Sequence, residues 1–88
     1  MATRTVTIAA KVGLHARPAA LFVQAVNAIG HPVSIAKAGG TPVDARSILA
    51  VMALGAQQGD EVVLTAEGEN AEAGLDRLAD MLAELDQE

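Results

Sequence analysis

The residues best suited to chemistry lie in one short stretch, Gly13-Leu14-His15-Ala16-Arg17-Pro18-Ala19-Ala20. His15 supplies a ring nitrogen that can act as a nucleophile, because an ordinary histidine pKa of about 6.5 leaves the ring largely neutral near neutral pH. Arg17 adds a permanent cation, and its planar fork of N–H donors matches the oxygens of a phosphate. Acceptance of a phosphoryl group depends mainly on positioning and charge, and these two residues supply a nucleophile and an anion-binding group. The stretch therefore has the minimum equipment for accepting a phosphoryl group at His15.

The same stretch lies where a predicted strand gives way to a predicted helix. Gly13 permits a sharp turn, and Pro18 falls in the first helical turn, where a missing N–H costs no internal bond. Free N–H groups and the positive end of the helix dipole would then favour an anion near His15. A histidine at a helix start is more often a cap or an ordinary surface residue, so its position alone favours a functional role only weakly.

Turn-forming residues divide the chain into seven short elements. Residue patterns typical of strands occupy four segments: 3–9, 32–37, 41–44 and 61–66. Apolar residues at helical spacing occupy three others: 16–28, 48–54 and 71–85. Ser47 and Asn70 are the predicted N-caps of the second and third helices, and Gly30 is the predicted end of the first.

The resulting order, β-α-β-β-α-β-α, predicts an α+β fold. Because strands and helices each have one apolar face, we expect an open-faced β-sandwich: a four-stranded antiparallel sheet with three helices on one face. The chain has 88 residues, so we expect a single domain over residues 1–88. A domain of this size has a modest core, which favours a site on the surface.

A second stretch, Ala45-Arg46-Ser47-Ile48-Leu49-Ala50-Val51-Met52-Ala53-Leu54-Gly55, follows the octapeptide around His15. The octapeptide resembles the active-site signature of HPr, the histidine-containing phosphocarrier of the bacterial sugar phosphotransferase system. The second stretch resembles the signature around that family's regulatory serine. The spacing of the two motifs and the order of the elements also match, so the resemblance covers essentially the full chain.

The resemblance implies a stoichiometric phosphocarrier rather than an enzyme. His15 would accept a phosphoryl group on its δ1 nitrogen from phospho-enzyme I and pass it to the IIA component of a sugar transporter. Arg17 would neutralise the phosphoryl charge, with Ala16 and Pro18 supporting the site. No metal or organic cofactor is implied. Partner docking is expected at five residues, of which at least one of the last three should belong to the core: Ala20, Gln24, Ile48, Leu49 and Met52.

Ser47 has two interpretations. As a helix N-cap it has a sufficient structural reason to be serine, because its oxygen can accept an orphan backbone N–H. The resemblance adds a second role, phosphorylation by a dedicated serine kinase that would have a matching phosphorylase. A phosphate at a helix N-terminus would not break the helix but would add negative charge to the docking surface. Both interpretations stay open on the sequence alone.

The chain departs from the family pattern at several positions. Val12 stands where many relatives carry a small polar residue, which removes one hydrogen bond to a phosphoryl group. Gln24 and Asn27 stand where some relatives carry lysines, so partner preference is open. His31 precedes Pro32 in a turn and matches no motif, so we expect it on the surface.

Composition excludes several other functions. The chain has no cysteine and a single aromatic residue, which argues against thiolate chemistry and against stacking on nucleic-acid bases. The net charge is −5; residues 1–46 carry five basic residues and one acidic, whereas residues 47–88 carry one basic and ten acidic. No segment is apolar enough to cross a membrane or resembles a signal peptide. We therefore expect a cytoplasmic protein that binds no nucleic acid, and its one small continuous core suggests a monomer.

Four alternative functions compete with the phosphocarrier of sugar transport. A carrier of the parallel nitrogen-related phosphotransferase system would share the fold and the histidine motif, so only partner choice separates the two. An HPr-like regulatory module that never carries the phosphoryl group is disfavoured, because such relatives lose the histidine. A small RNA-binding domain would need basic clusters and exposed aromatic residues. A hydrolase would need an acid–base pair, a triad or a metal cluster, none of which the sequence suggests.

Overall fold

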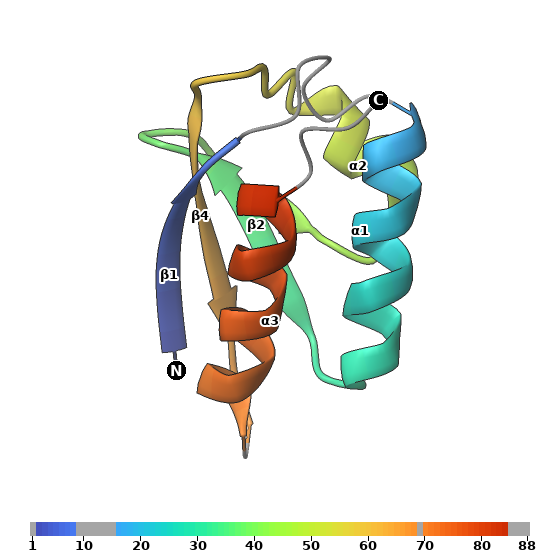
Figure 1. The fold of residues 1–88 in the computed structure, drawn as a ribbon, viewed down its shortest axis with the longest axis vertical. Helices are drawn as coiled ribbons and strands as arrows, with labels where there is room; N and C mark the ends of the chain where they lie inside the picture. Colours follow the sequence, from blue (N-terminus) through green and yellow to red (C-terminus); the bar gives the residue numbers. More distant parts are fainter. Residues whose placement is uncertain (1, 9–15, 69, 85–88) are drawn as a thin grey trace.

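The computed structural model describes residues 2–8, 16–68 and 70–84. Seven elements follow one another along the chain: β1 (Ala2–Thr7), α1 (Ala16–Ile29), β2 (Val33–Lys37), β3 (Val43–Asp44), α2 (Ile48–Ala53), β4 (Glu61–Ala66) and α3 (Ala71–Glu84). The predicted order is confirmed. The helices lie on one side of the sheet, so the open-faced α+β architecture is confirmed as well (Figure 1).

The four strands form one antiparallel sheet in the order β1-β4-β2-β3. β4 lies centrally, with Val6 of β1 opposite Val62 and Ile35 of β2 opposite Leu64. Because side chains alternate along a strand, this register places Val62, Leu64 and Ile35 together on the covered face. The threonines of β1 point to the opposite face and are exposed.

The core lies between that face of the sheet and the helices. α1 contributes its predicted stripe, including Phe22 and Val26, and α3 contributes its leucines at helical spacing, including Leu75 and Leu78. Each of these side chains is fully buried. A helix with one apolar stripe gains most of its stability from such packing rather than from its own propensity. The apolar periodicity thus determines which side of each helix faces the sheet.

The elements differ from the predicted ones mainly at their ends. β3 contains only Val43–Asp44, because Pro42 has no N–H to donate to a ladder and does not extend the strand. α2 ends one residue before Leu54. Ala9 and Leu85, at the predicted ends of the first strand and the last helix, lie outside the described residues.

Asn70 precedes α3 as predicted but has an unexpected backbone conformation. Its carbonyl accepts the first helical bond from the Gly74 N–H at 3.1 Å, which is what an N-cap carbonyl does. Its φ of 65° lies in the left-handed region, whereas an N-cap residue is usually extended. Asparagine tolerates the left-handed region better than most residues with a side chain. Asn70 therefore occupies the predicted cap position through its carbonyl, with a left-handed rather than an extended backbone.

Candidate functional site

The segments that position the candidate site meet at one end of the molecule. Figure 1 shows the end of β1, the start of α1, the end of β2, α2 and the start of β4 at this end, with the starts of β1 and α3 at the other. His15 and Val12 lie outside the described residues. Arg17, Ala16 and Pro18 lie in the first turn of α1, and the Arg17 side chain is exposed. An exposed guanidinium there is available to an anion bound at the helix start.

The connection from β3 to α2 is fixed by short-range hydrogen bonds. The Asp44 Oδ1 oxygen accepts from the Arg46 backbone N–H at 2.9 Å and from Arg46 Nε at 3.4 Å. The Asp44 carbonyl accepts from the Ser47 N–H at 3.2 Å. The hydrogen bond from the Arg46 backbone is the main reason that the pKa of Asp44 lies below its ordinary value, with smaller contributions from the Arg46 side chain and its charge.

Ser47 is the N-cap of α2. Its backbone is extended, with φ −105° and ψ 116°, and its Oγ accepts from the Ala50 N–H at 3.2 Å. This is the geometry that satisfies one orphan donor of a helix start. The structural role of Ser47 is thus present in the fold. Ser47 is partly exposed, so a modifying enzyme could reach part of its side chain from solvent.

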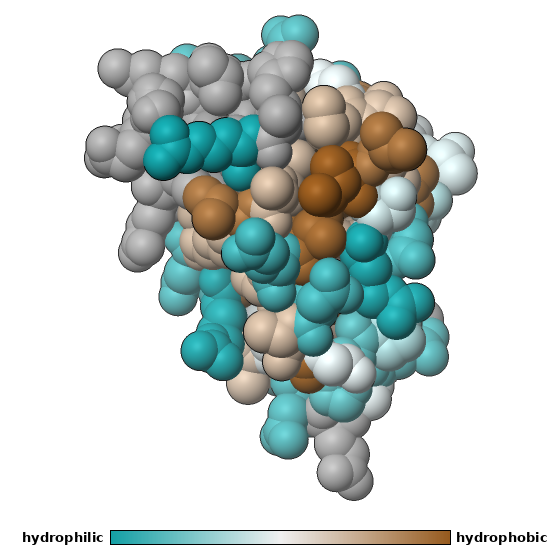
Figure 2. Space-filling model, turned by 90° about the vertical axis from the view of Figure 1, so that its right-hand side faces the viewer, coloured by the Kyte–Doolittle hydropathy of each residue, from teal (hydrophilic) through white to brown (hydrophobic). Residues whose placement is uncertain are grey.

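Three large apolar side chains on α1 and α2 face solvent, and we call them the apolar patch: Leu21, Ile48 and Leu49. Leu49 is 79% exposed, and the other two are each 41% exposed. α1 and α2 pack against each other, and the surface over them carries a concentration of hydrophobic atoms (Figure 2). A cluster of exposed apolar side chains is typical of a protein-binding surface.

The other predicted docking residues divide between surface and core. Gln24 is exposed beside the patch, and Ala20 is partly buried. Met52 is partly buried and packs against the core. Leu21 was missed by the sequence prediction. A signal was present, because Leu21 lies four residues after Arg17 and three before Gln24, which puts all three on one helix face.

His31 reaches the surface, as its sequence context predicts, but it is not fully exposed. The side chain is partly buried and lies beside Gly68, where a Cβ added to the glycine would lie only 2.9 Å from His31 Nδ1. The turn before β2 and the turn after β4 therefore pack together through a histidine and a glycine. This contact lies away from the apolar patch, and we assign it to packing.

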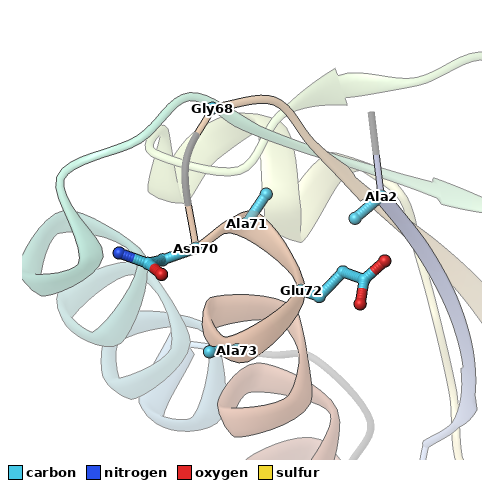
Figure 3. A pocket seen from close by; sticks show the side chains of 6 residues that line it. All are labelled: Ala2, Gly68, Asn70, Ala71, Glu72 and Ala73. Atoms are coloured by element: carbon cyan, nitrogen blue, oxygen red, sulfur yellow. The ribbon is translucent and has the colours of Figure 1, made fainter.

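Neither of two shallow cavities formed by described residues includes a predicted site residue. One, of about 380 Å³, is lined by residues around the start of α3 (Figure 3). The other, of about 410 Å³, lies by the start of β2 and the ends of β3 and β4. Across residues 2–8, 16–68 and 70–84, no cluster of three or more histidine, cysteine, aspartate or glutamate side chains is arranged to hold a metal ion. Among the same residues, no helix has the length and hydropathy to span a membrane.

Comparisons with known proteins agree with this geometry. The family model for the PTS HPr component phosphorylation site matches residues 2–84. The phosphocarrier protein HPr of Streptomyces coelicolor is 57% identical over 84 residues, which cover 96% of this chain and 90% of that protein. The HPr-like protein Crh of Bacillus subtilis is 43% identical over 79 residues, covering 90% of this chain and 92% of that protein.

Solved structures give the same result. The crystal structure of phosphocarrier protein HPr from Bacillus anthracis superimposes with a TM-score of 0.86 at 40% identity, covering 92% of this chain and 95% of that one. The likeness extends over nearly the whole chain. On this agreement of sequence and fold, the chain belongs to the HPr family of phosphotransferase-system phosphocarriers.

Proposed function

We propose that this protein is a cytoplasmic, monomeric phosphoryl carrier that accepts a phosphoryl group on His15 from phospho-enzyme I and passes it to IIA components of sugar transporters. The observation that carries the proposal is the exposed Arg17 in the first turn of α1, on the helix face that leads to the apolar patch. A cation for the phosphoryl oxygens and a surface for a protein partner are thus adjacent. Family membership supports the same role.

In the proposed reaction His15 is the nucleophile. A lone pair on its δ1 nitrogen attacks phosphorus, and the bond from phosphorus to the donor breaks as the new P–N bond forms, with the electron pair leaving on the donor. Arg17 stabilises the charge on the phosphoryl oxygens during transfer. The second transfer repeats the step with His15 as the leaving group. Each carrier molecule thus takes up one phosphoryl group for each one that it passes on, and it acts as a stoichiometric carrier between its two partners.

Docking is assigned to the apolar patch together with Ala20, Gln24 and Met52. Leu49 loses little of its exposure on folding, so its side chain contributes little to stability and is available to a partner. Burying one leucine side chain against a partner is worth about 1.5–3 kcal/mol, so three such side chains are a substantial part of a transient interface.

The proposal is tested by the intact mass after incubation with enzyme I, Mg²⁺ and phosphoenolpyruvate. We expect the wild type to gain one acid-labile phosphoryl group and His15→Ala to gain none. If enzyme I is active on a known carrier but leaves this protein unmodified, the sugar-branch proposal fails. The same assay with the nitrogen-branch enzyme I then separates a nitrogen-branch carrier from a regulatory module.

A regulatory role for Ser47 is the second candidate. The observation that favours it is the position of Ser47 at the start of α2, beside Ile48 and Leu49, together with the similarity to Crh. A phosphate there would place about two negative charges next to the apolar patch and oppose the docking of an acidic partner. Incubation with a serine kinase and ATP should then give an acid-stable phosphoprotein in the wild type and none in Ser47→Ala.

A further inference from the structure

We propose that Asp60 is a positioning residue for phosphoryl transfer. Its turn joins the end of β1, the strand that precedes His15 in the chain, to the segment that follows α2. Asp60 lies in the turn between α2 and β4 and belongs to neither sequence motif. The inference rests on the proposed carrier function and concerns the geometry of the same site.

The first step is the turn itself. Asp60 Oδ2 accepts from the Gln57 backbone N–H at 2.9 Å, and the Asp60 N–H donates to the Gln57 carbonyl at 2.9 Å. Gly59, between them, has a φ of 92°, a conformation that glycine adopts without strain. The carboxylate therefore closes the turn through a charge-assisted bond that an alanine could not make.

The second step is the end of β1. The Asp60 carbonyl accepts from the Ile8 N–H at 2.9 Å, and the Gly59 N–H donates to the Ile8 carbonyl at 2.9 Å. Ile8 is also 1% exposed, so its side chain is held in the core. Ile8 is the last described residue before the segment that carries His15. The turn closed by Asp60 thus fixes the backbone of Ile8 on both its N–H and its carbonyl.

The third step links the turn to the rest of this end of the molecule. Lys37 Nζ, at the end of β2, lies 3.6 Å from Asp60 Oδ2. The turn is joined to α2 through Ala56, which is 2% exposed. Figure 1 shows these segments together at the end where α1 begins. Asp60 and its turn therefore join the end of β1 and the end of β2 to α2, the helix that carries Ile48 and Leu49 of the apolar patch.

This coupling matters because in-line transfer depends on the distance between partner and acceptor. A misplacement of about 1 Å can cost a large factor in rate even when the mutated residue is remote from the chemistry. Loss of the Asp60 carboxylate should slow the transfer step while leaving the patch intact. The expected signature is a lower kcat at an unchanged KM in transfer from phospho-enzyme I.

The test compares Asp60→Ala with Asp76→Ala in the full chain. Asp76 is the matched control: it is an exposed acid in an ion pair, 2.8 Å from Arg4 Nε, and lies on α3. We expect Asp60→Ala to lower kcat at least about tenfold with KM within twofold, and Asp76→Ala to change neither. Asp60→Asn, which can still accept the Gln57 N–H, should recover most of the rate. Lys37→Gln, which keeps the turn closed by Asp60, should have a rate similar to that of Asp60→Asn.

Circular dichroism must show each variant fully folded at the assay temperature, so that unfolding does not enter the rate. Equal effects of Asp60→Ala and Asp76→Ala, or a wild-type rate in folded Asp60→Ala, would overturn the inference. If the wild type itself accepts no phosphoryl group, the carrier proposal fails and the positioning role is decided by NMR instead. The His15 ring resonances should then shift in Asp60→Ala but not in Asp76→Ala, and unshifted resonances would reject the role of Asp60.

Discussion

Leu49 is the side chain on which the docking proposal depends most directly. At 79% exposure it contributes little to folding, so Leu49→Ala should change the free energy of unfolding by less than about 0.5 kcal/mol. Loss of its burial against a partner should raise KM in transfer from phospho-enzyme I roughly tenfold, with kcat retained. Urea unfolding and steady-state transfer kinetics measure the two effects. Thr5→Ala, on the open face of the sheet, is the control and should change neither value.

Asp44 makes a pH-dependent contribution to stability. Its pKa in the folded chain lies below the ordinary value of 3.8, chiefly because of the Arg46 backbone hydrogen bond. A carboxylate whose pKa is lowered by folding stabilises the folded state at pH values above its ordinary pKa. That contribution disappears as the pH falls through the pKa of the folded state. In Asp44→Asn the melting temperature should therefore fall less steeply below about pH 4 than in the wild type. Parallel curves for the two proteins would contradict the assignment.

Helix α2 has only six residues, so its stability depends strongly on the N-cap hydrogen bond of Ser47. Ser47→Ala removes the acceptor for the Ala50 N–H and should lower the free energy of unfolding by about 1 kcal/mol. Ser47→Asp, which can also cap, should retain most of that stability. Urea denaturation of the three proteins tests the prediction, and equal stability of Ser47→Ala and the wild type would show that the cap is unimportant.

α1 and α3 approach closely at Gly74. A Cβ on Gly74 would lie 3.1 Å from Ile29 Cγ2, which is too close for normal packing. Alanine gains about 1 kcal/mol of helix propensity over glycine, whereas overpacking costs about 1–3 kcal/mol. Gly74→Ala should therefore destabilise the wild type by about 1 kcal/mol but stabilise the Ile29→Ala variant. A double-mutant cycle of unfolding free energies measures this coupling, and additive effects would contradict it.

At the scale of the elements, the sequence predicted the order and type of each one. Most have a clear period of apolar residues, whereas β3, with two residues, was signalled by the preceding Gly39-Gly40 turn. The predicted N-cap at Ser47 was confirmed because a cap is a local interaction that residue type alone can signal. Close approaches between elements were not predictable. The contacts of Gly74 with Ile29 and of Gly68 with His31 join residues far apart in the chain, and no local pattern signals them.

For the whole molecule, the sequence located the candidate chemistry but not the framework that positions it. The motif around His15 is continuous in the chain, so its residue types were sufficient to suggest phosphoryl transfer. Leu21 shares a helix face with Arg17 and Gln24, but its neighbours in the patch lie on another helix, which the helix spacing alone does not show. Asp60 was missed because its partners come from β1, β2 and its own turn, which only the folded sheet brings together.

The distribution of charge over the whole chain leads to the last prediction. Residues 1–46 hold five of the six basic residues, including Arg17 and Arg46, whereas nearly all the acidic residues follow Ser47. An acidic partner would be attracted to the basic part and repelled by α3, and added salt screens such attraction over about 10 Å at 0.1 M ionic strength. The value of kcat/KM in transfer from phospho-enzyme I should therefore fall several-fold between about 50 and 500 mM NaCl.

Two variants that each remove one positive charge show which part of the surface attracts the acidic partner. Arg46 lies next to Ser47 at the start of α2, and Arg77 is an exposed residue of α3. Arg46→Gln should lower kcat/KM at low salt and flatten its dependence on salt, because a rim charge near a docking surface acts mainly on the association rate. Arg77→Gln should leave both unchanged. If the two variants behave alike, the attraction reflects net charge rather than a surface near α2; if the wild-type rate is independent of salt, docking depends on the apolar patch alone.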